Sequence, residues 1–310
     1  MFSVSPGDIH GKVLKMQSLW RNITTLTNSL RTFHDFDISV IFLGDYCDRG
    51  RDTRHTFDFL VDLPRAHADV SFNFLCGNHD HAFLKFLDNE RNYAETCTDF
   101  SPLKPEVLYQ GKGHHEMHLQ GRRWAGVFEG QADSIYQSRA TFDSYSSPYA
   151  DREHLLANIP SHHLKFLRSL ELVVDGDYEH YGRVIAVHAG LEEGNPEDVE
   201  EQIRQLKAWD DTKAWVEPLC GRKNVMDVPD SLLLEQTWVV SGHHSMFSIQ
   251  GKRIIIDECG GMEDKRMSAV MMLPANSDLA VACASFCDGE NISWSRCVDP
   301  LVKLLRIRSN

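Results

Sequence analysis

Five short polar motifs follow one another along this chain, and nearly every one comes directly after an apolar run. They are, in order, GDIHG (7–11), GDYCDRG (44–50), GNHD (77–80), VHAG (187–190) and GHH (242–244). Each places a carboxylate, an amide or an imidazole beside a glycine, a residue that permits a sharp turn at the end of a strand. Oxygen and nitrogen ligands on such turns suit a pair of divalent metal ions. Taken together and in this order, the motifs predict a dinuclear metal site that acts on phosphate.

The first part of the chain alternates between strand and helix patterns. The hydrophobic periodicity predicts strands at 2–5, 38–43 and 70–75, and helices at 13–30, 53–63 and from 82 onward. Alternation of this kind builds a parallel sheet with helices on its faces, and ligands then bind at the carboxyl ends of the strands. The first three motifs lie at those ends.

The second half is richer in strands. We expect helices at 162–172 and 196–208, strands at 183–187, 238–241 and 253–257, and an antiparallel pair at 267–273 and 278–285 joined by a turn at 274–277. These patterns predict an α/β fold in which two sheets pack face to face and helices flank them. We expect residues 1–310 to form a single domain.

The polar stretch at about 93–152 interrupts this rhythm. It contains paired histidines, paired arginines and several tyrosines. Two interpretations are equally open: a capping insertion over the site, or surface loops and short helices without a role in substrate binding.

Composition limits the function classes. The 310-residue chain carries 32 basic and 45 acidic residues, a net charge of -13. That balance argues against non-specific binding to nucleic acid, which depends on basic surface. Neither a secretory signal nor an apolar stretch long enough to cross a membrane is visible, and the eight scattered cysteines contain no C-x-x-C pair. We therefore expect reduced thiols and a cytoplasmic or also nuclear protein without a membrane or nucleic-acid partner.

The residue types within the motifs suggest individual roles. A carboxylate such as Asp45 can bridge two ions, which would clamp a phosphate and share a bridging water that becomes hydroxide near neutral pH. His79 would protonate the leaving oxygen, Asp48 would hold His79 protonated, and Arg49 would grip phosphate oxygens. The expected metal ligands are Asp8, His10, Asp45, Asn78, His188 and His243.

The set GDIHG, GDYCDRG, GNHD, VHAGL and SGHH resembles the phosphoprotein phosphatases, the metal-dependent serine/threonine phosphatases and their bacterial relatives. The resemblance spans 7 to about 261 and implies a single calcineurin-like metallophosphatase domain, with a central β-sandwich flanked by helices. It also implies the same ligand set, with His79 as proton donor, Asp48 as its partner and Arg49 on phosphate.

Departures from the eukaryotic serine/threonine enzymes point to a subgroup. Asp80 stands where those enzymes have glutamate, and Ala189 where they have glycine. With SGHH at 241–244, the motifs look most like the plant Rhizobiales-like phosphatases, which are associated with phosphotyrosine. Family members use a second phosphate-binding arginine in an interval that here contains Arg222; the alternative is a solvated basic turn. His244 stands where relatives often have threonine, and either faces the cleft to bind substrate or packs in the core.

The leading expectation is thus a protein phosphatase that acts on phosphotyrosine by direct attack of a metal-bridging hydroxide. Cys47 should not be the nucleophile, because the chain lacks the C-x5-R loop of cysteine-dependent tyrosine phosphatases. Three alternatives stay open: a phosphoserine/phosphothreonine phosphatase, a diadenosine-polyphosphate hydrolase, and a non-catalytic scaffold that binds phosphopeptides. Nitrogen and oxygen ligands without thiolate fit manganese, iron or zinc; we expect two divalent ions, with manganese first and iron or zinc as alternatives. The partner expected is a phosphorylated protein substrate, and the oligomeric state is left open.

Overall fold

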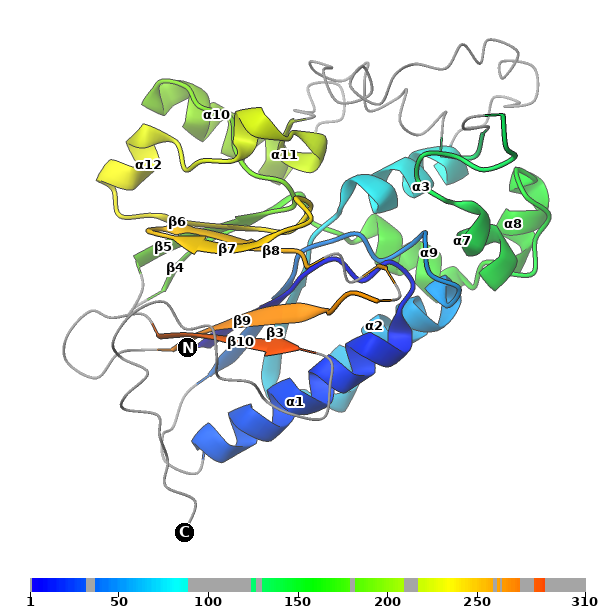
Figure 1. The fold of residues 1–310 in the computed structure, drawn as a ribbon, viewed down its shortest axis with the longest axis horizontal. Coiled ribbons are helices and arrows are strands. Elements are labelled where there is room, and N and C mark those ends of the chain that lie inside the picture. The colour runs from blue at the N-terminus through cyan, green and yellow to red at the C-terminus, as the bar shows by residue number, and fades with distance from the viewer. Residues whose placement is uncertain are drawn as a thin grey trace.

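The computed structural model describes residues 2–31, 37–88, 124–126, 130–178, 182–208, 217–258, 261–262, 264–273 and 282–287. Their strands form two five-stranded sheets, which lie one above the other in Figure 1. Helices lie on the outer side of each sheet, so the predicted α/β sandwich flanked by helices is confirmed.

The first sheet carries the first three motifs. Its strand order is β10-β9-β1-β2-β3, with β1 (Phe2–Pro6), β2 (Ile38–Phe42) and β3 (Val70–Phe74) parallel to one another. The remaining two strands, β9 (Ser268–Leu273) and β10 (Ala282–Cys287), are antiparallel to each other, as predicted, and β9 runs antiparallel to β1. Since β1, β2 and β3 point the same way, the three motifs that follow them meet at one edge of the sheet.

The second sheet carries the two histidine motifs. Its strand order is β4-β5-β6-β8-β7, and β5 (Gly182–Val187), β6 (Trp238–Ser241) and β8 (Arg253–Ile256) are parallel. The outer strands, β4 (Val173–Tyr178) and β7 (Phe247–Gln250), pair antiparallel with their neighbours. The motifs at 187–190 and 242–244 leave this sheet at the ends of β5 and β6.

Period-two alternation along the strands divides the core into two layers. Ile41 and Leu43 join Val184, Val240 and Ile256 in the apolar layer between the sheets. Val40 and Phe42 point to the opposite face, where they join the larger core beneath the helices. A strand buried on both faces shows the continuous apolar run that β2 has.

The helices cover the outer faces of the sheets. In Figure 1, α1 (Val13–Arg31) and α2 (Thr53–Ala66) lie beneath the first sheet, and α10 (Pro196–Ala208) lies above the second. Short α11 (Glu217–Cys220), the 3-10 turn Lys223–Val225 and α12 (Asp230–Leu234) also lie on that upper side. A group at one end of the sandwich comprises α3 (Asn78–Asp88), α7 (Arg139–Ser144), α8 (Arg152–Asn158) and α9 (Ser161–Arg168).

Local chemistry explains where α10 starts. Asn195 accepts a hydrogen bond from the backbone N–H of Asp198 at 3.0 Å, which satisfies one of the unpaired donors of the first turn. Glu197 and Asp198 place negative charge in that turn, where the helix dipole favours it. The helix therefore has the bounds that the sequence pattern predicts.

An ion-pair network fastens β4 and β5 to α10. Asp175 on β4 accepts hydrogen bonds from Arg183 Nε at 2.8 Å and from Lys207 Nζ at 2.8 Å, and Arg183 also reaches Glu200. Burial by itself would raise the pKa of Asp175, but the two cationic donors outweigh it and lower the pKa. The carboxylate is therefore stabilised in its charged form.

The differences from the sequence-based prediction concern element ends and short elements. The third motif does not precede α3 but forms its first turn, because α3 begins at Asn78. The predicted helix at 162–172 ends at Arg168 and is followed by β4, which the pattern missed, as it missed β7. The predicted turn at 274–277 lies outside the described residues. Among the helices that the structure describes, none is long and apolar enough to span a membrane.

Candidate metal centre

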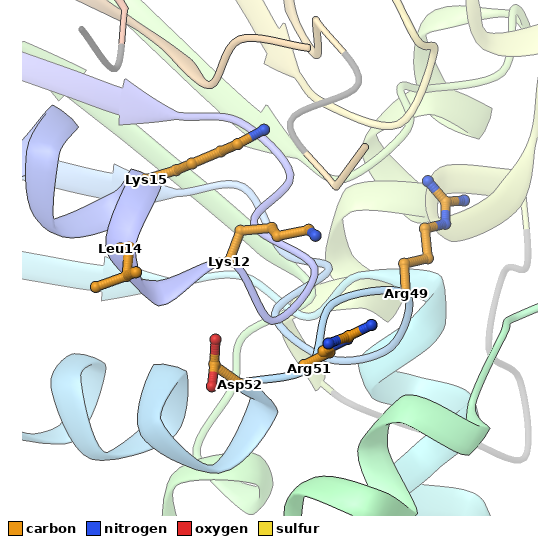
Figure 2. A pocket seen from close by; sticks show the side chains of 6 residues that line it. All are labelled: Lys12, Leu14, Lys15, Arg49, Arg51 and Asp52. Atoms are coloured by element: carbon orange, nitrogen blue, oxygen red, sulfur yellow. The ribbon is translucent and has the colours of Figure 1, made fainter. Parts of the chain in front are cut away.

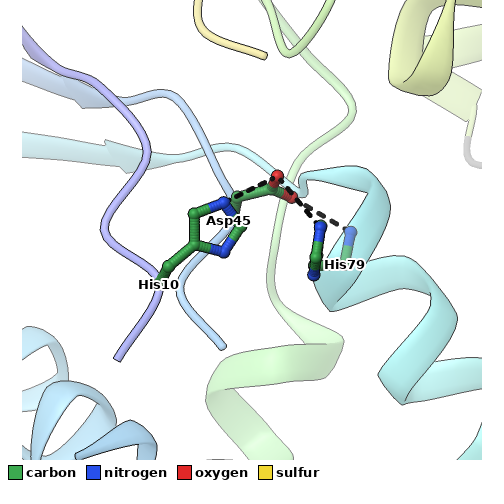
Figure 3. A group of neighbouring side chains, drawn as sticks. All are labelled: His10, Asp45 and His79. Carbon is green, nitrogen blue, oxygen red and sulfur yellow. Dashed lines mark hydrogen bonds and ion pairs between the residues drawn. The ribbon is translucent and has the colours of Figure 1, made fainter. Parts of the chain in front are cut away.

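Asp45 lies between two groups of imidazoles. Its Oδ1 is 3.4 Å from His188 Nε2, and its Oδ2 is 3.6 Å from His10 Nε2 and 3.9 Å from His79 Nε2. Figure 3 shows His10 and His79 on either side of the carboxylate. Each oxygen of one carboxylate therefore faces a different set of nitrogen atoms, which is the arrangement that a ligand bridging two ions requires.

Backbone carbonyls orient the imidazoles around this carboxylate. His10 Nδ1 donates to the carbonyl of Cys47 at 3.0 Å, and His188 Nδ1 donates to that of Leu43 at 2.6 Å. A histidine that donates through Nδ1 carries its lone pair on Nε2, and such a bond fixes the tautomer of a metal ligand. Both Nε2 atoms point toward Asp45.

The other predicted ligands converge on the same place. Asn78 Oδ1 is 3.2 Å from His188 Nε2, and His243 belongs to the same group of buried side chains as Asp45 and His188. Asp8 Oδ2 lies 3.9 Å from His10 Nε2. All six predicted ligands are thus brought together from five motifs and two sheets.

The chemistry of this centre fits divalent cations. Two buried nitrogen atoms of the cluster, His10 Nε2 and His243 Nε2, have no hydrogen-bond partner, a costly arrangement for buried polar atoms. Burial raises the pKa of Asp8, and the nearby Asp257 and Asp45 carboxylates raise it further. Burial lowers the pKa of His188, but Asp45 outweighs it and the pKa rises to about 9. The cluster therefore attracts positive charge, either as protons or as metal ions.

His79 and Asp48 form a buried pair. His79 Nδ1 lies 2.8 Å from Asp48 Oδ2, and His79 Nε2 faces Arg49 at 3.4 Å. Burial lowers the pKa of His79, while the charge of Asp45 acts in the opposite direction. Burial also raises the pKa of Asp48. The hydrogen bond between the two side chains fixes the imidazole plane, with Nε2 directed toward the centre.

Residues from the polar stretch at 93–152 surround this pair. Trp124 Nε1 donates to Asp48 Oδ2 at 2.8 Å, and Thr141 Oγ1 donates to Asp48 Oδ1 at 2.7 Å. Both hydrogen bonds lower the pKa of Asp48, against the effect of burial. The ring of Tyr136 packs edge-on against His79, with 4.7 Å between centroids. Part of the stretch therefore supports the His79–Asp48 pair; whether the whole of it caps the site stays a prediction, because 89–123 and 127–129 lie outside the described residues.

The candidate phosphate-binding residues differ in their surroundings. Arg49 lines a cavity of about 620 Å³ together with Lys12, Lys15 and Arg51, as well as Leu14 and Asp52, which Figure 2 shows. Arg222 donates through a guanidinium N–H to the backbone carbonyl of His243 at 2.6 Å, so it reaches the edge of the metal cluster. His244 is buried, and its Nε2 donates to the carbonyl of Ala189 at 2.7 Å.

The backbone around the centre is strained at the ligands themselves. His10, Asp45 and His243 adopt positive φ angles of 46°, 55° and 69°, a conformation unusual for residues other than glycine. Gly44 has a φ of 100°, as its predicted turn requires. At Gly77 the requirement is steric and not conformational. A Cβ atom there would collide with Asp45 Oδ1, so no larger residue fits.

Sequence reasoning missed Asp80, which ties two motifs together. Its Oδ1 accepts from the backbone N–H of Tyr46 at 2.9 Å, and its Oδ2 accepts from that of Gly77 at 3.0 Å. The carboxylate thus holds the GDYCDRG loop against the start of α3. Its place at the fourth position of the GNHD motif was the available signal. Trp124 and Thr141 offered none, because neither stands in a recognisable motif.

Cys47 is an inert thiol in this environment. The side chain is completely buried, and burial together with the Asp48 and Asp80 carboxylates raises its pKa well above the usual value. A thiol held in this way is not a nucleophile at neutral pH.

Comparison with known proteins supports the fold. No family model and no curated protein sequence matches the chain. Among solved structures, a cold-active protein-tyrosine phosphatase of a psychrophile, Shewanella sp., is similar over 93% of this chain and 80% of its own, with a TM-score of 0.52 and 13% identity. A second structure of a cold-active protein tyrosine phosphatase is similar over 92% of this chain and 78% of its own, with a TM-score of 0.52 and 13% identity. A protein serine/threonine phosphatase of Saccharomyces cerevisiae overlays more loosely, with a TM-score of 0.44, 14% identity and coverage of 94% and 81%. The chain therefore shares the fold of the two cold-active protein-tyrosine phosphatase structures.

Proposed function

We propose that this protein is a metal-dependent phosphatase that hydrolyses phosphomonoesters, with phosphotyrosine in proteins as the substrate. The observation that carries the proposal is the position of Asp45, whose two oxygens face separate groups of buried imidazoles. Two divalent ions, when bound, supply Lewis acidity and an activated water for attack on phosphorus. Asp8, His10, Asp45, Asn78, His188 and His243 would hold them, with manganese as the expected metal.

The residues of the chain would perform the remaining tasks. Arg49 would bind phosphate oxygens through its planar fork, next to His79 Nε2. His79, protonated on Nε2, would deliver that proton to the leaving oxygen, and Asp48 would stabilise the charged imidazole. Arg222, which donates to the backbone carbonyl of His243, would contribute a second guanidinium. His244, which donates to a backbone carbonyl, would position the loop of His243 more than it would bind substrate.

Support for the tyrosine-directed activity comes from the motif pattern and from the structural neighbour that is a protein-tyrosine phosphatase. The cavity beside Arg49 favours a second candidate. Its basic lining by Lys12, Lys15, Arg49 and Arg51 would also accept the phosphate chain of a dinucleoside polyphosphate.

One assay separates these candidates. Phosphate release is measured from a single peptide carried in phosphotyrosine, phosphoserine and phosphothreonine forms, and from diadenosine tetraphosphate, in manganese and again with chelator. We expect chelator-sensitive release from the phosphotyrosine form. Release mainly from the other peptides or from the dinucleotide would keep a metal-dependent hydrolase and overturn the substrate. Equal release with and without chelator would overturn the metal dependence, and no release from any compound would contradict the enzyme itself.

A further inference from the structure

A second group of metal-ligating side chains lies between two helices, away from the candidate metal centre. Asp58 on α2 faces His162 and His163 at the start of α9. Asp58 Oδ1 lies 3.3 Å from His162 Nε2 and 2.9 Å from His163 Nε2. Within the described residues, three groups of such ligand atoms lie close enough to share an ion, and this is the one that does not contain Asp45.

The spacing of the three atoms matches a tetrahedral ion. Zinc binds imidazole nitrogen and carboxylate oxygen at about 2.0–2.2 Å, which places neighbouring ligand atoms roughly 3.4 Å apart. The separations from Asp58 are close to that value, so an ion would need only a small outward movement of the side chains. Two imidazoles and one carboxylate without thiolate are a ligand set that zinc-class ions accept.

The surroundings of His163 favour ligation through Nε2. The ring is completely buried, and its Nδ1 lies 2.9 Å from the hydroxyl of Tyr145. A hydroxyl can donate or accept, so Tyr145 can accept the Nδ1 proton when the Nε2 lone pair is engaged. A neutral imidazole is the form that binds a metal.

The group formed by Asp58, His162 and His163 is open to solvent on one side. The side chains of Asp58 and His162 are 43% and 50% exposed, which leaves an open position and an entry path from solvent. The bond would therefore be reversible and weaker than at a fully buried centre.

We propose that Asp58, His162 and His163 form a third metal site, for a divalent transition ion of the zinc class, which ties α2 to α9. The site is independent of the proposed catalysis. Its consequence is mechanical: α2 begins directly after the GDYCDRG loop, and Phe57 beside Asp58 packs against His163 and Phe166 of α9. The ion would brace the helix that follows Arg49. Without an ion, Asp58 serves only as a hydrogen-bond acceptor for the two histidines.

The test compares zinc bound per full-length chain in the wild type and in two variants, Asp58→Asn and His162→Gln. Both positions are half exposed, so both variants should fold. His55→Gln is the matched control, because His55 is an exposed histidine of the same helix that pairs with Asp52 instead. Each protein is dialysed to equilibrium against zinc chloride at one free concentration, and the zinc bound in excess of the dialysate is then measured by mass spectrometry.

We expect both variants to hold one zinc equivalent fewer than the wild type, and the control to hold the same number. Thermal unfolding gives a second readout. Added zinc should raise the Tm of the wild type and the control more than that of either variant, while the metal-free proteins unfold at similar temperatures. Phosphate release with manganese should be unchanged in all three variants. Equal zinc content in wild type and both variants, or an equal rise in Tm with zinc, would overturn the proposal.

Discussion

Substitution of Trp124 tests whether its hydrogen bond to Asp48 supports the His79–Asp48 pair. The indole N–H donates to the same Asp48 oxygen that binds His79, and its ring stacks on Phe83 at 4.5 Å between centroids. Trp124→Phe removes the donor and keeps an aromatic ring in the stack. The change therefore addresses the hydrogen bond more than the packing.

The expected magnitude follows from the hydrogen bond that is lost. A bond to a charged group is worth about 1.5–3 kcal/mol, and each 1.36 kcal/mol in the transition state is about tenfold in rate. Asp48 still accepts hydrogen bonds from Thr141 and His79, so part of the stabilisation of its carboxylate is retained. We expect kcat to fall by roughly tenfold, at the low end of that range, with KM nearly unchanged.

The assay is manganese-dependent phosphate release as a function of substrate concentration. Trp20→Phe is the matched control, because Trp20 is also buried and donates its own N–H, to His67 at 3.0 Å, far from Asp48. Both variants should lose some thermal stability, but only Trp124→Phe should lose turnover. Equal turnover in the two variants would refute the idea that this residue supports the His79–Asp48 pair.

Four further predictions test other parts of the structure. His79→Asn should lower kcat by about a hundredfold or more, as expected for the loss of a general acid, and metal analysis should show unchanged metal content; wild-type turnover would exclude the role. Arg49→Ala should raise KM by roughly tenfold or more through loss of a charge-assisted bond to phosphate, whereas Arg51→Ala in the same cavity should change KM less; equal effects would contradict the assignment of the phosphate to Arg49. Cys47→Ser should keep turnover within about twofold, since the buried thiol is not the nucleophile; an inactive variant that folds and retains its metals would disprove this. Because two cationic partners lower its pKa from the usual 3.8, Asp175 stabilises the fold at neutral pH, and this effect fades as the pH falls from about 4 through the lowered pKa; Asp175→Asn should therefore reduce the unfolding free energy by about 1 kcal/mol at pH 7 and by less at pH 3, in denaturant titrations at both values.

The sequence alone was sufficient for the order of the main strands and helices. Apolar runs such as that of β2 are continuous because the strand is buried on both faces, so their positions are visible in one dimension. The same holds for the candidate ligands, which follow strand ends and therefore meet where parallel strands end together. The bounds of α10 were also predictable, because its cap, its first-turn acids and its apolar stripe are all local signals.

Contacts between distant segments could not be read in this way. Trp124 and Thr141 reach Asp48 across 76 and 93 residues, and no motif marks either of them. Asp58 meets His162 and His163 only because α2 packs on α9. The positive φ angles of His10 and Asp45, which are not glycines, likewise depend on contacts from other segments that hold these loops in place.

Local patterns in the sequence are thus enough to show which side chains are available for chemistry and at which strand ends they stand. The position of Asp45 between two sets of imidazoles, and the residues that surround the His79–Asp48 pair, follow from the packed fold instead. Those properties arise from packing between segments that are far apart in the chain, and no local free-energy preference encodes them.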